Sequence, residues 1–198
     1  MLQFRTGHSD RYTIAEEAQM AIEGGCRWIQ LHMPADADIA YIRDTTSEII
    51  PLCQECSAFL TIEDNPELAK ELSIHGVHLT KGGIPVAAAT RQELGPEAII
   101  GVEVATLAEI DSAQAADIDY VTLPPEMPLA RCHKLISDSR QHGLKIPIVA
   151  AGDVTLSNLR QHLDAGFSGV AVGQDIIDAS DPVERTTAFL LSLERGQI

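Results

Sequence analysis

Residues 146–175 read IPIVAAGDVTLSNLRQHLDAGFSGVAVGQD. Two short apolar runs, Pro147–Ala150 and Gly169–Val172, enclose a stretch with a helical pattern, and each run is soon followed by a glycine, Gly152 or Gly173. A strand, a helix and a second strand in this order predict a βαβ unit with parallel strands. Glycine after a strand lets the backbone approach the oxygens of a phosphate, so both strand ends also predict a phosphate site. The alternative is that the two glycines only turn the chain from strand to helix.

The same alternation of apolar run and helical stretch extends over the whole chain. Eight similar units without a linker predict an α/β protein with a closed (β/α)8 TIM barrel, in a single domain over residues 1–198. A doubly wound open sheet is the alternative. The predicted strands are Leu2–Arg5, Trp28–His32, Phe59–Glu63, Gly76–Leu79, Ile99–Glu103, Tyr120–Leu123, Pro147–Ala150 and Gly169–Val172.

Helix starts support this division of the chain. Thr13 and Glu16 have the spacing of a capping box, and Asn65 is followed by a proline suited to the first helical turn. Pro51 lies within the long helical stretch before Phe59, where we expect it to kink or split the helix.

Composition limits the classes of partner. The net charge is −15 over 198 residues, which disfavours nucleic acids and anionic membranes as partners. Arg5 and Asp10 interrupt the first residues, so the sequence shows no signal peptide, and no apolar run is long enough for a membrane span. We therefore expect a cytoplasmic protein. Cys53 and Cys56 have CxxC spacing without a second pair, which favours plain thiols on a helix over a metal or redox site.

Polar residues gather at the predicted carboxyl ends of the strands, where barrels of this class carry their sites. In WIQLHMP, residues 28–34, Gln30 and His32 alternate with apolar residues and therefore share one face of the strand. Glu103 and Glu126 come from neighbouring strand ends, and crowded carboxylates raise one another's pKa or hold a cation. Asp64 stands directly before a helix, where capping is its alternative role.

Four stretches, in this order and spacing, resemble the thiamine phosphate synthase and TenI family of small (β/α)8 barrels. EGGCRWIQLHMP, residues 23–34, resembles the family's stretch ending in QLREK, and residues 59–80 resemble its strand ending in NDR with the following GVHLGQ. Residues 99–125 resemble the stretch from IGVSVH to GP, and residues 146–172 resemble PVVAIGGI through GADGVAV.

The resemblance implies an enzyme of thiamine biosynthesis that joins an aminopyrimidine diphosphate to a thiazole phosphate and releases diphosphate. By the family's pattern, Gln30 meets the pyrimidine, and Asp64 matches the first aspartate that holds a Mg²⁺. Gly152 persists on the thiazole-phosphate side, and Gly173 and Gln174 replace a Val-Ser pair there. The resemblance implies no organic cofactor, and it makes small phosphorylated pyrimidine and thiazole ligands the expected partners.

The chain departs from the family where the diphosphate binds. His32 replaces the arginine of QLREK, Pro34 replaces its lysine, and Glu103 replaces the serine of GVS. The loop LPPEMPLARC, residues 123–132, lacks the family's Thr-Lys pair. Lys81 is the candidate replacement cation.

Three hypotheses follow for the function. The first is a synthase with an altered diphosphate site. The second is a TenI-like thiazole tautomerase, which needs a general acid or base; His32 or Glu126 would serve. The third is a non-catalytic phosphate-ligand-binding or regulatory barrel. The sequence leaves the oligomeric state open, a homo-oligomer included.

Overall fold

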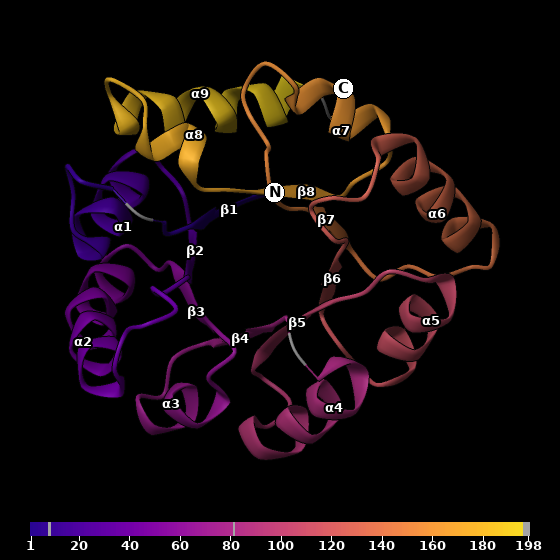
Figure 1. The fold of residues 1–198 in the computed structure, drawn as a ribbon, viewed down its shortest axis with the longest axis horizontal. Helices are drawn as coiled ribbons and strands as arrows, with labels where there is room; N and C mark the ends of the chain where they lie inside the picture. The colour runs from indigo at the N-terminus through magenta and orange to yellow at the C-terminus, as the bar shows by residue number, and fades with distance from the viewer. Residues whose placement is uncertain (8, 81, 196–198) are drawn as a thin grey trace.

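In the computed structural model, which describes residues 1–7, 9–80 and 82–195, the chain forms a closed barrel of parallel strands in the order β1 to β8 (Figure 1). The predicted fold class is therefore confirmed. The strands are β1 (Leu2–Arg5), β2 (Trp28–Leu31), β3 (Phe59–Glu63), β4 (Gly76–Leu79), β5 (Ile99–Glu103), β6 (Tyr120–Thr122), β7 (Ile148–Ala150) and β8 (Gly169–Val172). They differ from the predicted strands by at most one residue at an end.

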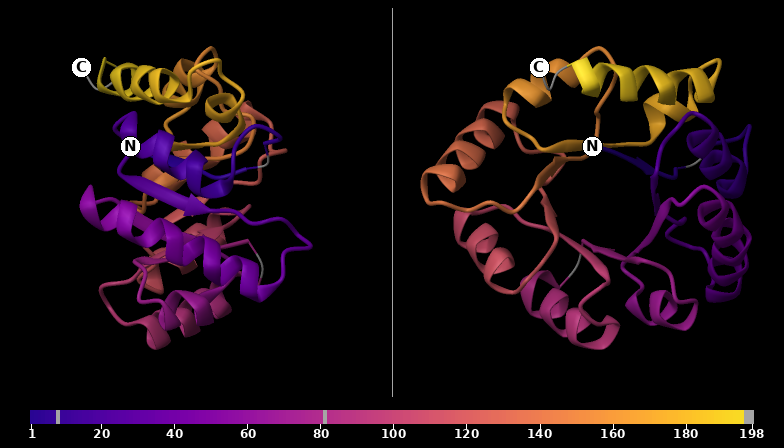
Figure 2. Two further views of the ribbon diagram at one scale, coloured as in Figure 1. Left: turned by 90° about the vertical axis from the view of Figure 1, so that its left-hand side faces the viewer. Right: turned by 180° about the vertical axis from the view of Figure 1, so that it is seen from behind.

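The helices surround the barrel as an outer ring (Figure 2). They are α1 (Ile14–Glu23), α2 (Ile39–Glu55), α3 (Pro66–Glu71), α4 (Gly83–Leu94), α5 (Leu107–Ala115), α6 (Leu129–Gln141), α7 (Leu159–Asp164), α8 (Gln174–Ile177) and α9 (Pro182–Arg195). Among the described helices none has the combined length and apolarity that crossing a membrane requires.

Local sequence signals fix several helix ends. At α1, the N–H of Glu16 donates to Oγ1 of Thr13 over 3.2 Å and the N–H of Thr13 donates to Oε2 of Glu16 over 2.8 Å, which confirms the capping box. Asn65 caps α3 through the N–H of Leu68 at 3.1 Å. Helix α2 is not split at Pro51. Pro51 is exposed, so solvent can satisfy the carbonyl group that it leaves without a helical N–H.

Strand alternation separates two layers of side chains. Residues such as Phe4, Ile29, Leu60 and Val170 are fully buried between the barrel and its helices. Their neighbours along each strand point into the barrel. Residues in register on neighbouring strands point to the same face of the sheet. The inward-facing residues of one strand therefore lie beside those of the next. The inward pairs are Arg5 with Gln30, Glu63 with His78, His78 with Gly101, and Glu103 with Thr122.

Tyr120 fills the barrel beneath the mouth. Its ring stacks on the His78 ring with centroids 5.4 Å apart and meets Trp28 edge-on at 5.0 Å. Its hydroxyl accepts a hydrogen bond from Nε2 of Gln3 at 3.1 Å. Gly101 makes this possible, because a Cβ atom there would lie 2.1 Å from the Tyr120 ring. The Tyr120 ring therefore fills part of the barrel interior below the mouth.

Candidate functional site

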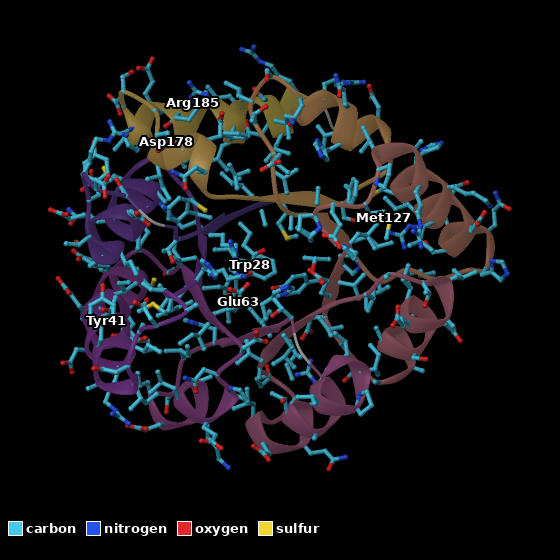
Figure 3. All side chains as sticks on the ribbon, in the orientation of Figure 1. Trp28, Tyr41, Glu63, Met127, Asp178 and Arg185 are labelled. Atoms are coloured by element: carbon cyan, nitrogen blue, oxygen red, sulfur yellow. The ribbon has the colours of Figure 1, made fainter. Side chains whose placement is uncertain are left out.

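Four polar side chains from β1, β2 and β3 converge at the mouth. Nη2 of Arg5 donates to both oxygens of Glu63, at 3.1 and 3.2 Å, and lies 2.7 Å from Nδ1 of His32. Nδ1 of His32 also contacts Oε2 of Glu63. Nε2 of Gln30 donates to Oε1 of Glu63 at 3.3 Å. Figure 3 shows Glu63 pointing into the centre of the ring.

Glu63 is a fixed negative charge in this cluster. Burial raises the pKa of its carboxyl, but the hydrogen bond from His32 and the charge of Arg5 outweigh burial and bring the pKa down to about 2. The side chain is only 12% exposed. Glu63 therefore stays ionised at neutral pH, and its charge is matched locally by Arg5.

Glu103 has the opposite electrostatic setting. Burial raises its pKa, and so do the nearby carboxylates Glu126, Glu63 and Asp64. Glu126 itself lies exposed in the loop between β6 and α6. The predicted crowding of carboxylates at the mouth is thus present in the structure, and it contributes to the raised pKa of Glu103.

An inner cavity of about 120 Å³ lies under this cluster. Its volume corresponds to about four water molecules or one six-membered ring. The walls combine hydrogen-bonding side chains with small residues that leave space. They are Gln3, Arg5, Gln30, Glu63, His78, Thr80, Glu103, Thr122, Pro125, Ala151, Gly152 and Ala171.

A second, outer cavity of about 420 Å³ adjoins the inner one and shares Gly152 with it. It is lined by residues 152–155, by Gln174, Asp175, Asp178 and Ala179, and by Arg185. Gly152 has a φ of +97°, and a Cβ atom there would lie 2.5 Å from Cβ of Pro125. Only glycine fits this position without strain, and it forms part of the wall of both cavities.

Most of the residues singled out in the sequence lie around these two cavities. Gln30 and Glu103 line the inner cavity, Gln174 lines the outer one, and His32 contacts the Arg5–Glu63 pair. Gly173 instead marks a close approach of backbones, because a Cβ atom there would lie 2.6 Å from the carbonyl oxygen of Arg5. A Gly173→Asp variant therefore disturbs the fold and is not a clean test of phosphate binding.

Asp64 is oriented by its neighbours. It has a φ of +50°, and its carboxylate accepts the N–H of Thr80 at 2.7 Å and also the Thr80 hydroxyl. Lys81, the candidate replacement cation, lies outside the described residues. Among the residues that are described, no three His, Cys, Asp or Glu side chains are grouped so as to hold a metal ion. Within the described part of the chain, Asp64 is therefore not one member of a three-residue cluster of this kind.

Arg5, His78 and Arg185 are among the cavity side chains to which the sequence analysis gives no role. Arg5 ends a four-residue strand, where a charged residue commonly just terminates the apolar run. Arg185 lies on α9, beyond the last strand. His78 is buried, and burial lowers the pKa of its imidazole to about 4, so the ring is neutral at pH 7.

Fold and site together define a (β/α)8 barrel protein with two adjoining ligand cavities at the carboxyl ends of its strands. Residues 3–176 match the family described as thiamine monophosphate synthase. The chain belongs to this family.

Individual relatives agree with that assignment. The thiamine-phosphate synthase of Bacteroides fragilis is 34% identical over 201 residues, covering 96% of this chain and 98% of that protein. The thiamine-phosphate synthase of Pyrococcus abyssi is 30% identical over 86% of this chain and 84% of its own length. The solved thiamine phosphate pyrophosphorylase from Pyrococcus furiosus superposes with a TM-score of 0.83 at 25% identity, covering 98% of this chain and 96% of that one.

Proposed function

We propose that this protein acts in thiamine biosynthesis as a synthase that joins an aminopyrimidine diphosphate to a thiazole phosphate and releases diphosphate. The observation that carries the proposal is the pair of cavities that share Gly152 in their walls. A condensation needs two ligands side by side with their reacting atoms in contact, and two adjoining cavities provide that arrangement. Membership of the family supports the same reaction.

The inner cavity is the proposed pyrimidine site. Gln30 supplies an amide and Glu103 supplies an acceptor for the N–H groups of an aminopyrimidine, while both oxygens of Glu63 are already engaged by Arg5, His32 and Gln30. Arg5 and His32 lie at the same mouth, where the diphosphate would extend from the ring. His32 and Glu126 remain the proposed groups for proton transfer.

The outer cavity is the proposed site of the thiazole phosphate. Gly152 and Gln174 line it, and Gly173 precedes Gln174 at the start of α8. Glycine at these two positions would let backbone N–H groups approach a phosphate, although Gly173 itself is not among the residues that line the cavity.

A Mg²⁺ ion would take Asp64 as its one protein carboxylate and diphosphate oxygens and water as its other ligands, an arrangement common for this ion. Its contribution would be to neutralise charge on the leaving diphosphate. The rest of the proposal depends on the protein's own side chains. We also propose a cytoplasmic location, since the four cysteines are free thiols.

The experiment is turnover with both substrates, with and without Mg²⁺, measured as thiamine phosphate formed. We expect product with Mg²⁺ and a large loss of kcat/KM in Gln30→Ala. Arg43→Gln is the control, because Arg43 lies on α2 and pairs with Glu71 at the surface. Absence of product under both conditions, with thiazole phosphate still bound, would contradict the proposal.

A further inference from the structure

The outer cavity contains one basic side chain. Among its lining residues in the described part of the chain, only Arg185 of α9 carries a positive charge, whereas Asp153, Asp175 and Asp178 carry negative ones. A phosphate in this cavity needs a counter-charge as well as backbone donors. Arg185, which can supply that positive charge, lies on a helix and not at the end of a strand.

Asp175 holds Arg185 in place. Nη1 of Arg185 donates to Oδ2 of Asp175 at 2.9 Å, and the N–H of Leu156 donates to the same oxygen at 3.3 Å. These contacts connect α9, α8 and the loop after β7. A guanidinium carries five N–H donors in a fixed fork, so Nη2 and Nε supply donors to a ligand while Nη1 stays on Asp175.

The burial of these charges decides which of them acts on a ligand. The side chains of Arg185 and Asp175 are 35% and 18% exposed, so solvent screens them only partly. Asp153 and Asp178 are exposed at the rim, and Oδ1 of Asp178 accepts Nε2 of Gln174 at 2.7 Å. Water and salt weaken exposed charges much more than half-buried ones. Asp175 matches the charge of Arg185, so it is the remaining N–H donors of the guanidinium, away from the exposed carboxylates, that give an anion a place on this side.

We propose that Arg185 is the phosphate-binding cation of the outer cavity, and that Asp175 orients it. Figure 3 shows Arg185 beside α8 and α9, away from the Arg5–Glu63 cluster at the centre of the barrel. This inference rests on the proposed function, because it assigns the binding residue for the phosphate of the thiazole substrate.

Arg11 is the rival cation. It lines a neighbouring cavity with Ser9 and Asp10, and that cavity shares Gln174 and Asp178 with the outer one. Nη2 of Arg11 donates to the carbonyl oxygens of Ile177 and Ala179. These bonds hold Nη2 at the end of α8, and Arg11 is not among the residues that line the outer cavity, so it is the less suited of the two.

Calorimetry on the full chain tests the inference with three probes: thiazole phosphate, the same thiazole alcohol without its phosphate, and inorganic phosphate. The variants are Arg185→Gln, Arg185→Lys and the control Arg160→Gln. Arg160 pairs with Asp164 on the surface of α7, and its side chain is 71% exposed. Thermal unfolding followed by circular dichroism shows that each variant is folded.

Arg185→Gln should weaken binding of thiazole phosphate by about tenfold or more, the effect of a charged hydrogen bond, and leave the alcohol unchanged. Arg185→Lys should restore part of the loss, and Arg160→Gln should change nothing. An equal loss for phosphate and alcohol, or no loss, would overturn the inference. So would a loss that follows Arg11→Gln instead of Arg185→Gln.

The inorganic phosphate arm separates the inference from the proposed function. If thiazole phosphate does not bind but inorganic phosphate does, and Arg185→Gln weakens it, the proposed substrate is wrong and the assignment of Arg185 stands. If the natural protein turns over thiazole phosphate and Arg185→Gln leaves the dissociation constant for thiazole phosphate unchanged, the function stands and the assignment of Arg185 is wrong.

Discussion

Nη2 of Arg5, at the end of β1, lies 2.7 Å from Nδ1 of His32, which directly follows the end of β2. His32 stands where the family's QLREK stretch has its arginine. The guanidinium of this chain therefore reaches the same part of the mouth from β1 instead of β2. Because Glu63 pairs with it at 3.1 Å, the positive charge at the mouth is largely matched before any ligand arrives.

Acid should weaken the fold through Glu63. Its pKa is about 2 in the folded protein against an ordinary value of 4.5, so the stabilisation is complete above pH 4.5 and is lost as the pH falls toward 2. The shift corresponds to something on the order of 3 kcal/mol. Urea unfolding at pH 7 and pH 3 should show a smaller difference in Glu63→Gln than in the natural protein. A parallel loss in both proteins would contradict this role.

His78 should remain neutral until the pH is well below the ordinary value for histidine. Burial lowers its pKa from 6.5 to about 4, so the unfolded chain binds a proton that the folded one does not. Stability should therefore fall as the pH drops from 6.5 to 4. The ring resonances of His78, followed by nuclear magnetic resonance, should not titrate above pH 5. Titration near pH 6.5 would show that the imidazole is accessible to water.

Gly101→Ala should destabilise the barrel by about 1 to 3 kcal/mol, because a methyl group there would overlap the Tyr120 ring. Truncation of the ring in Tyr120→Leu removes the overlap. We expect the double variant to be more stable than the sum of the two single changes predicts, as measured in a double-mutant cycle by thermal unfolding. Strict additivity would mean that the two residues do not compete for the same space.

Free diphosphate should bind weakly in the absence of Mg²⁺. The charges of Arg5 and Glu63 cancel each other. The carboxylates of Glu103 and Asp64 repel an anion. An unscreened pair of like charges 4 Å apart costs about 4 kcal/mol at a dielectric constant near 20. Calorimetry should give a dissociation constant in the millimolar range without metal and tighter binding with it. Micromolar affinity without metal would show that a cation at the mouth has been overlooked.

Glu103→Gln should tighten binding of diphosphate. The substitution removes a carboxylate whose raised pKa already reports unfavourable neighbours, and it preserves the size of the side chain. Glu194→Gln on the exposed end of α9 is the matched control for a change in net charge. Equal effects of the two substitutions would indicate a general electrostatic change rather than a local one.

The sequence predicts the barrel closely because the signals for strands and helix starts are local. Alternation along a strand also places Gln30 and Glu103 on the inner face correctly. Arg5 and Glu63 are 58 residues apart, and no pattern along the chain shows that they form an ion pair. Arg185 lies on α9 and Asp175 lies on α8. Only the packing of these helices brings the two side chains together. The roles in binding or catalysis stay predictions for all the proposed site residues: Gln30, His32, Asp64, Glu103, Glu126, Gly152, Gly173 and Gln174.

Gly152 belongs to the walls of both cavities, and its backbone can give way very little, since Pro125 stands against it. A ligand that moves this residue from one side changes the space available on the other side. Occupancy of the two cavities is then thermodynamically coupled, and the coupling is reciprocal: the factor by which the pyrimidine ligand alters affinity for the thiazole equals the factor by which the thiazole alters affinity for the pyrimidine. Such coupling is symmetric, so it sets no order of addition; it would appear as a dissociation constant for each ligand that changes by the same factor when the other ligand is present.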